Sequence, residues 1–331
     1  MRHLTPISSL IRNLSAALVV CAGTLAATSP ALAWTDKPIK LIVPAPPGGT
    51  IDVVARFFVD QLAADLGQPV IVDNKPGAGG GIGTQALLAA PADGTTLMVT
   101  ASNVLLEIPH VMKQPYDVLK DLRAVSAVAR AGLVLVSNTD VPAKDFKELM
   151  GYLKANSGKL SFASYSAGTA SHYAGMILGQ REKVDMVHAP FAGSPPALQQ
   201  VMSGQIPIMF DGMVTSTPLV NGGKLKAYAI SGKTRFSKLP QVPTFTEVGY
   251  PELDFSNWLG FVASSKMSPE LAEKINQAIA KTAASPKVRE RLLGAGFEIP
   301  APQSSADLNQ SMRGENERNA AIVKTFGIKL N

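Results

Sequence analysis

The chain of 331 residues has little metal-binding or redox-active chemistry to offer. It contains one cysteine, Cys21, and four histidines, His3, His110, His172 and His188. A lone cysteine cannot form a disulfide bond within the chain and leaves no C-x-x-C motif. No two histidines have the H-x-x-H or H-x-x-x-H spacing that places both on one helical face. We therefore expect no metal and no cofactor.

Long basic or apolar runs are also missing. Charged residues make up 17% of the chain and the net charge is +6, without a Lys/Arg run or an aromatic-basic stripe. This pattern gives no indication of a nucleic-acid partner. Beyond the first 33 residues no apolar run reaches the roughly 20 residues of a spanning helix. A hydrophobic content of 46% in a chain of this length indicates a well-buried protein of about two domains.

Common catalytic and nucleotide-binding motifs are absent as well. The sequence has no G-x-x-x-x-G-K-[ST] and no G-x-S-x-G. The run Gly81-x-Gly83-x-x-Ala86 nominally fits a dinucleotide fingerprint, but no acidic residue follows about 20 residues later. Ser171 and His172 are neighbours on an expected helix and point about 100° apart. We assign no catalytic residue, although a secreted hydrolase using a serine at 164, 166 or 171 remains an alternative.

The N-terminal segment has the features of a secretory leader. Arg2 and Arg12 form a basic region, Leu14 to Ala27 is an apolar stretch, and Ala31-Leu32-Ala33 is an A-x-A cleavage signal. The sequence therefore predicts a signal peptide over residues 1–33, cleavage after Ala33, and a mature protein in the periplasm.

What the chain has in abundance is glycine turns between strands and helices. The first follows the expected strand Ile39–Val43 and reads VPAPPGGTIDVVAR, with Thr50 as the expected N-cap. Ile51, Val54, Phe58 and Leu62 then fall on one helical face. Such a turn presents free N–H groups and the positive end of a helix, which suits an anion.

Two further turns repeat this arrangement. GAGGGIGT, Gly77 to Thr84, follows the expected strand Val70–Asp73, and ASYSAGTASHYAG, Ala163 to Gly175, has Thr169 as the expected N-cap. His172 is either a packed histidine that braces this loop or a ligand contact. Polar residues also end two other strands, at Asn103 and Asp211. Asp211 is a helix cap, a lock on the loops, or an acceptor for a ligand hydroxyl or amine.

Strands and helices alternate along the chain, which predicts an α/β fold with mostly parallel strands. We expect strands at Leu122–Ala129 and Leu133–Ser137, and a helix opened by Ser268-Pro269-Glu270. The expected first domain covers residues 34–137 plus 255–331, and the second covers 138–254. The chain crosses between them near residues 137 and 255, which predicts a two-strand hinge.

Six patches of the sequence follow one another in a specific order and spacing: VPAPPGGTIDVVAR at 43–56, NKPGAGGGIGT at 74–84, AGTASH at 167–172, PFAGSPPALQQVMSGQIPIMFD at 190–211, RFSKLPQVPTFTEVGYPE at 235–252 and NWLGFVAS at 257–264. Together they resemble the periplasmic solute-binding proteins of tripartite tricarboxylate transporters, the Bug family. The resemblance implies a two-domain periplasmic binding protein fold of the type II-like class. Each domain is a mostly parallel sheet flanked by helices, with the ligand in the cleft between domains.

The resemblance also implies a function. It implies a monomeric binding protein, not an enzyme, that delivers a small organic carboxylate to integral membrane transporter subunits. A sensor that presents its solute to a signalling receptor is a further alternative. The sequence leaves the ligand open among aliphatic di- or tricarboxylates, amino acids and aromatic carboxylates.

The turns, together with the polar residues at strand ends, give the candidate ligand-binding set. We expect the main donors to be backbone N–H groups and hydroxyls of residues 48–50, 79–84 and 164–169, with Arg56 too far along its helix to take part. The full set is Pro47, Gly48, Gly49, Thr50, Ala78, Gly79, Gly83, Thr84, Asn103, Ser164, Ser166, Ala167, Gly168, Thr169, His172, Phe191, Gly193 and Asp211.

Overall fold

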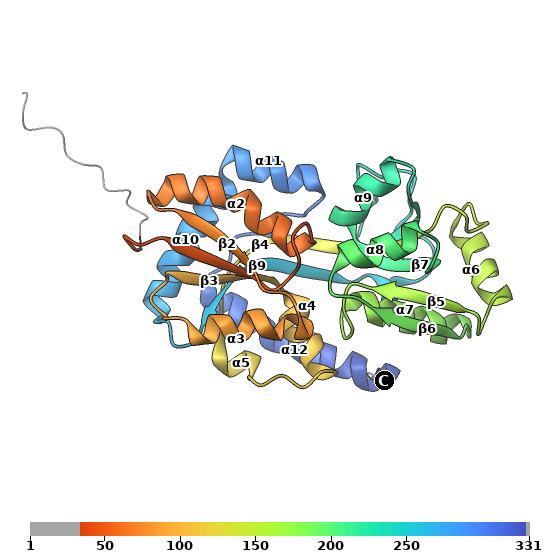
Figure 1. The fold of residues 1–331 in the computed structure, drawn as a ribbon, viewed down its shortest axis with the longest axis horizontal. Helices are drawn as coiled ribbons and strands as arrows, with labels where there is room; N and C mark the ends of the chain where they lie inside the picture. Colours follow the sequence, from red (N-terminus) through yellow and green to blue (C-terminus); the bar gives the residue numbers. More distant parts are fainter. Residues whose placement is uncertain (1–33, 329–331) are drawn as a thin grey trace, which may run out of the picture.

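The computed structural model describes residues 34–328, so the expected leader and its cleavage site lie outside the described residues. Two groups of strands lie side by side and share one long strand (Figure 1). The hydrogen-bonded order is β2-β1-β3-β9-β4-β7-β5-β6, and β8 also pairs with β4. Among residues 34–328, no helix combines the length and apolar character needed to cross a bilayer.

The first group, which we call the first lobe, contains the N-terminal strands and the C-terminal helices (Figure 1). Strand β1 pairs in parallel with β2 and β3, whereas β9 runs antiparallel to both β3 and β4. Helices α2, α10 and α11 pack against one another. The elements are β1 (Ile39–Val43), α2 (Thr50–Leu66), β2 (Val70–Asn74), η1 (Ala78–Gly80), α3 (Gly81–Ala89), β3 (Thr96–Ala101), α4 (Ser102–Leu106), η2 (Ile108–His110), α5 (Val118–Asp121), β9 (Ser256–Ser264), α10 (Pro269–Ala284), α11 (Pro286–Ala295) and α12 (Ser305–Phe326).

The sequence signals in this lobe correspond to real packing. The expected apolar face of α2, formed by Ile51, Val54, Phe58 and Leu62, is buried as predicted. The ring of Phe58 meets that of Phe261 edge to face at 5.3 Å between centroids. Each such side chain contributes about 1.5–3 kcal/mol through burial.

The predicted helix opening at residue 268 is confirmed as well. Helix α10 begins at Pro269, and the Ser268 hydroxyl accepts a hydrogen bond from the Leu271 amide at 3.2 Å. This cap satisfies one of the amides that a helix start leaves without a partner.

The second group, which we call the second lobe, contains the strands from the middle of the chain. Strand β5 lies between β6 and β7, parallel to both, whereas β4 is antiparallel to β7 and β8. The elements are α6 (Phe146–Ala155), β5 (Leu160–Ser164), α7 (Ala170–Glu182), β6 (Met186–Pro190), α8 (Ser194–Met202), β7 (Ile208–Gly212), α9 (Met213–Asn221), β8 (Lys226–Ile230) and η3 (Pro251–Leu253).

One strand, β4 (Leu122–Ser137), connects the lobes. Residues 122–132 pair with β9, and residues 133–137 pair with β7 and β8. The expectation of two separate strands, 122–129 and 133–137, was therefore wrong. Residues Arg130-Ala131-Gly132, which the prediction left between the two strands, stay extended because they pair with Trp258, Asn257 and Ser256 of β9.

Candidate functional site

A cavity of about 370 Å³ lies where the two lobes face each other. Its wall includes segments that follow β1, β2, β3, β5 and β6, together with parts of β4, β7 and β9. The carboxyl ends of strands are where ligands sit in open α/β sheets. The lining residues are Pro44, Ala45, Pro46, Gly49, Thr50, Ile51, Pro76, Gly77, Ala78, Gly79, Gly80, Ala101, Asn103, Val104, Ile108, Met112, Ala131, Gly132, Leu133, Tyr165, Ser166, Ala167, Thr169, Pro190, Phe191, Ala192, Gly193, Ser194, Gly212, Asn257 and Leu259.

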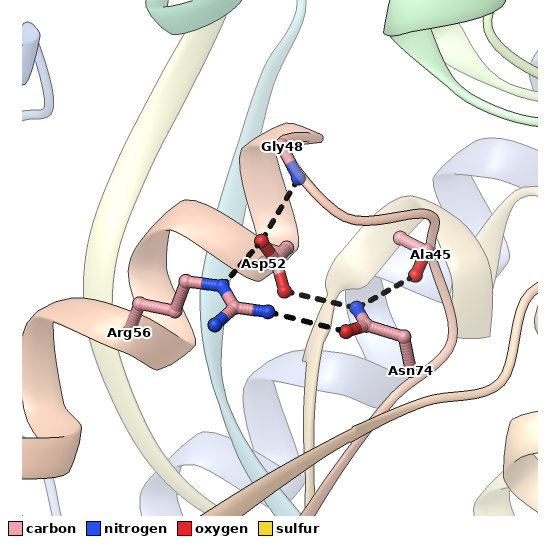
Figure 2. A network of polar contacts seen from close by, with 5 residues as sticks. All are labelled: Ala45, Gly48, Asp52, Arg56 and Asn74. Atoms are coloured by element: carbon pink, nitrogen blue, oxygen red, sulfur yellow. Dashed lines mark hydrogen bonds and ion pairs between the residues drawn. The ribbon is translucent and has the colours of Figure 1, made fainter.

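The turn before α2 is held by a buried carboxylate (Figure 2). Asp52 accepts hydrogen bonds from the Gly48 amide at 2.9 Å, Arg56 Nε at 2.8 Å and Asn74 Nδ2 at 2.9 Å. Asn74 Nδ2 also donates to the Ala45 carbonyl at 3.0 Å, which ties β2 to the turn. Burial would raise the pKa of Asp52, but the bonds from Arg56, Gly48 and Asn74 outweigh it and keep the pKa below its ordinary value.

This network determines which amides of the first turn are available. Gly48 donates to Asp52, and Gly49 donates to the Pro46 carbonyl at 3.2 Å, so neither amide is free for a ligand. The expected N-cap was Thr50, but the structure places Gly49 there and begins α2 at Thr50. The amides of Thr50 and Ile51 have no hydrogen-bond partner among residues 34–328, as helix geometry requires. The free amides of this turn are therefore those of Thr50 and Ile51, whereas the expected donors were residues 48–50.

The second glycine turn supplies another part of the wall. Gly79 and Gly80 have φ angles of +60° and +89°, which favour glycine, and both line the cavity together with Ala78. Gly83 and Thr84, by contrast, lie inside α3 and do not line it. A Cβ at Gly83 would lie 2.8 Å from Pro44 Cβ, so this glycine allows α3 to approach the turn after β1.

The third turn brings Ser166, Ala167 and Thr169 to the cavity from the second lobe. Thr169 holds the expected N-cap position of α7, yet its hydroxyl makes no cap bond and donates instead to the Ser166 carbonyl at 2.7 Å. The Gly168 amide donates to His172 Nδ1 at 3.2 Å. Of the two roles considered for His172, this bond favours bracing of the loop.

Two stacked histidines lie behind this turn. The rings of His172 and His188 are 3.8 Å apart between centroids, and Phe162 stacks on His188 at 5.0 Å. Burial lowers the pKa of His172 to about 4, and burial together with His172 lowers the pKa of His188 to about 3. Both rings are therefore neutral near pH 7.

Ser164 lies against this pair and is fully buried. Its hydroxyl is 2.7 Å from His188 Nε2 and also donates to the Ser166 carbonyl at 3.0 Å. Because one hydroxyl has a single proton, His188 then acts as the donor to Ser164. A catalytic histidine has to accept the serine proton, so this pair is arranged for structure.

Two polar residues at strand ends have different positions. Asn103 lines the cavity and donates from Nδ2 to Tyr165 OH at 3.3 Å across the lobes. Asp211 is fully buried outside the wall, where Oδ2 accepts bonds from the hydroxyls of Thr215 and Ser216 at 2.6 and 2.7 Å. Burial raises the pKa of Asp211 despite these bonds.

The predicted site residues thus fall into two groups. Those on the cavity wall are Gly49, Thr50, Ala78, Gly79, Asn103, Ser166, Ala167, Thr169, Phe191 and Gly193. Those away from the wall are Pro47, Gly48, Gly83, Thr84, Ser164, Gly168, His172 and Asp211, several of which hold the turns in place. Sequence reasoning missed Tyr165, which the third turn contains, and Asn257 and Leu259, which β9 brings from a distant part of the chain without a local motif.

One further residue missed in the sequence links the lobes directly. Glu107 is 3% exposed, follows α4 in the first lobe, and accepts a hydrogen bond from the Ala170 amide at the start of α7. Tyr173 OH donates to the Glu107 carbonyl at 3.0 Å. Burial, with a smaller contribution from nearby Glu315, raises the pKa of Glu107 to about 8.

Within residues 34–328 no cluster of metal-ligating side chains exists.

Comparison with known proteins connects this geometry to a family. Residues 54–328 match the model described as "Tripartite tricarboxylate transporter family receptor". Protein BugT of Bordetella pertussis is 32% identical over 315 residues, which cover 95% of this chain and 96% of BugT. These matches confirm the resemblance that the sequence patches indicated.

Solved structures give the same result for the fold. The periplasmic binding protein BugD aligns with a TM-score of 0.84 at 29% identity, covering 89% of this chain and all of BugD. MatC from Rhodopseudomonas palustris, solved with bound malate, aligns with a TM-score of 0.81 at 30% identity, covering 87% of this chain and 99% of MatC. The expected periplasmic binding protein fold is therefore confirmed.

Proposed function

Because this chain belongs to the tripartite tricarboxylate transporter receptor family, we propose that it captures a small organic carboxylate in the periplasm. The observation that carries this proposal is the cavity between the lobes, with the free amides of Thr50 and Ile51 at its wall. A carboxylate seated there accepts charge-assisted hydrogen bonds and faces the positive end of a 17-residue helix. Bound malate in the relative MatC supports the same ligand class.

Delivery to integral membrane transporter subunits follows as the second part of the proposal. Family membership supports it, and we infer a monomeric, exported protein that lacks residues 1–33 and catalyses no reaction. The alternative of a serine hydrolase has no support from Ser164, because its hydroxyl is buried and donates to a backbone carbonyl.

Ligand capture is proposed to involve motion of the lobes about the strands that join them. The pairing of β4 changes between Gly132 and Leu133, and both residues line the cavity. We place the hinge at this point and at the start of β9. A ligand that contacts both lobes then favours the closed arrangement through its higher affinity for that state.

Mass spectrometry of ligand released from purified protein, followed by calorimetry with the identified compound, tests this proposal. The expected result is a carboxylic acid that binds with micromolar or better affinity, about −8 kcal/mol or more favourable. Release of a phosphate ester or a sugar, with no carboxylic acid bound, would contradict it.

A further inference from the structure

The cavity wall carries no charged side chain. Its apolar part includes Ile51, Val104, Ile108, Met112 and Leu133, and β9 adds Leu259 while the loop after β6 adds Phe191. At about 370 Å³ the cavity is at the small end of the roughly 300–1,000 Å³ of small-molecule sites. Such a wall favours the burial of a compact apolar group.

Several polar side chains on the wall already have hydrogen-bond partners within the protein. Asn103 accepts from the Val104 amide at 2.8 Å and donates to Tyr165. The hydroxyls of Ser166 and Thr169 donate to the carbonyls of Ala167 and Ser166. Because the hydroxyls of Ser166 and Thr169 have already used their only protons, they cannot donate to a hydroxyl on the ligand, and a buried polar group without a full set of partners is costly.

The Oδ1 atom of Asn257 also has a partner, because it accepts from the Ser102 hydroxyl at 3.0 Å. One exception on the wall is Thr50, whose hydroxyl has no partner among residues 34–328 and lies beside the free amides at the start of α2. Thr50 Oγ1 also lies 3.0 Å from the ideal Cβ position of Gly212, so it faces the second lobe. The cavity therefore combines free backbone donors at Thr50 and Ile51 with a largely apolar wall.

The buried acids Asp52, Glu107 and Asp211 lie close in sequence or space to wall residues, but none of them lines the cavity, and Asp52 is paired with Arg56. Glu107 and Asp211 both lie outside the wall. Glu107 and Asp211 Oδ2 accept hydrogen bonds from the protein itself, and Asp211 Oδ1, which has no partner among residues 34–328, is fully buried. Burial raises the pKa of each, which favours their neutral forms. An ammonium group in the cavity would therefore be desolvated without a counter-charge.

We infer that the ligand is a carboxylate whose remaining body is apolar, without an ammonium or hydroxyl group beside the carboxylate. This inference rests on the proposed function and narrows it, because it excludes amino acids and hydroxy acids as preferred ligands. The recognition has two parts: the amides of Thr50 and Ile51 hold the carboxylate, and the wall around Ile108, Met112 and Phe191 packs on the body.

Calorimetry with two matched series tests the inference. The first series is 3-phenylpropionate, 3-phenyllactate and phenylalanine, and the second is succinate, malate and aspartate; within each, only the substituent next to one carboxylate changes. We expect the unsubstituted acid of the better-binding series to bind at least about tenfold more tightly than its hydroxy acid. A hydrophobic pocket rejects an added hydroxyl by up to roughly 100-fold. The amino acid is expected to bind most weakly.

The outcomes separate this inference from the proposed function. If phenylalanine or aspartate, or the corresponding hydroxy acid, binds as tightly as the unsubstituted acid, the apolar ligand class is wrong and carboxylate capture stands. If 3-phenylpropionamide or succinamide binds as tightly as its acid, carboxylate capture itself is wrong. If neither 3-phenylpropionate nor succinate binds while a hydroxy acid or amino acid is released from the purified protein, the apolar ligand class is wrong and carboxylate capture stands.

A variant supplies an independent readout. Ala192 lines the cavity from an exposed loop position, so a polar replacement there need not disturb the core. Ala192→Asp introduces a counter-charge for ammonium and should improve the affinity of the amino acid relative to the unsubstituted acid by about tenfold. Ala192→Asn has the same size without the charge and should leave the ratio near its wild-type value. If the affinity of the amino acid relative to the unsubstituted acid is unchanged in Ala192→Asp, the missing counter-charge is not the reason why amino acids bind weakly.

Discussion

Replacing Glu107 with glutamine removes a buried acid but keeps its shape and an oxygen that can accept from the Ala170 amide. Burial raises the pKa of Glu107 from 4.5 to about 8, so the native protein holds this proton where the unfolded chain releases it. Stability from this group is therefore fully present below pH 4.5 and is lost as pH rises through 8. Glu107→Gln has no titrating group at this position, so its stability should not fall with rising pH for this reason.

The magnitude follows from the two pKa values. The interval from 4.5 to about 8 corresponds to a loss on the order of 5 kcal/mol, at about 1.36 kcal/mol for each pH unit. Urea denaturation followed by circular dichroism from pH 5 to pH 9 measures it. We expect wild type and Glu107→Gln to be similar at pH 5, and the variant to be more stable by several kcal/mol at pH 9.

A control isolates the effect of burial. Glu317 is an exposed acid on α12, the helix that also carries Glu315, and Glu317→Gln should follow the wild-type pH dependence. Burial also raises the pKa of Glu315, so some pH dependence should remain in Glu107→Gln. Parallel stability curves for wild type and Glu107→Gln between pH 5 and pH 9 would refute the reasoning.

Four further predictions concern the site. Arg56→Ala should cost about 1–3 kcal/mol of stability in urea denaturation, because Asp52 loses a charged donor but keeps its bonds from Gly48 and Asn74. The ligand Kd of this variant should change less than about threefold, and complete loss of binding would contradict the amide-based site. Gly49→Val should weaken calorimetric binding at least about tenfold in a folded protein, because a Cβ there lies 3.2 Å from the Pro46 carbonyl oxygen; normal affinity would contradict the placement of the anion. A chelator should leave the Kd unchanged, and a loss restored by one divalent ion would reveal a metal site. X-ray scattering should give a smaller radius of gyration with saturating ligand, and an unchanged profile would contradict closure from an open state.

Short sequence patterns correctly predicted the structural features that depend only on neighbouring residues. The buried face of α2 and the Ser268 cap of α10 follow from spacing and capping chemistry within a few residues, and both are found in the structure. The glycine turns likewise predicted part of the wall from the first lobe, namely Gly49, Thr50, Ala78 and Gly79, because a turn after a strand has to lie at the end of the sheet.

What the sequence could not predict depends on partners far along the chain. Strand β4 continues through Gly132 because β9, more than 120 residues later, pairs with it. The sequence predicted the Gly48 amide as a donor to an anion, but in the fold this amide donates to Asp52. Glu107 had no motif of its own, and its contact with Ala170 arises only when the two lobes meet.

A crystal structure with the tightest-binding carboxylate tests the central claim most directly. We predict the carboxylate within hydrogen-bond distance of the Thr50 and Ile51 amides, with the body of the ligand enclosed by both lobes. A carboxylate held instead by an arginine or lysine side chain, or a ligand bound outside the cavity, would contradict the account.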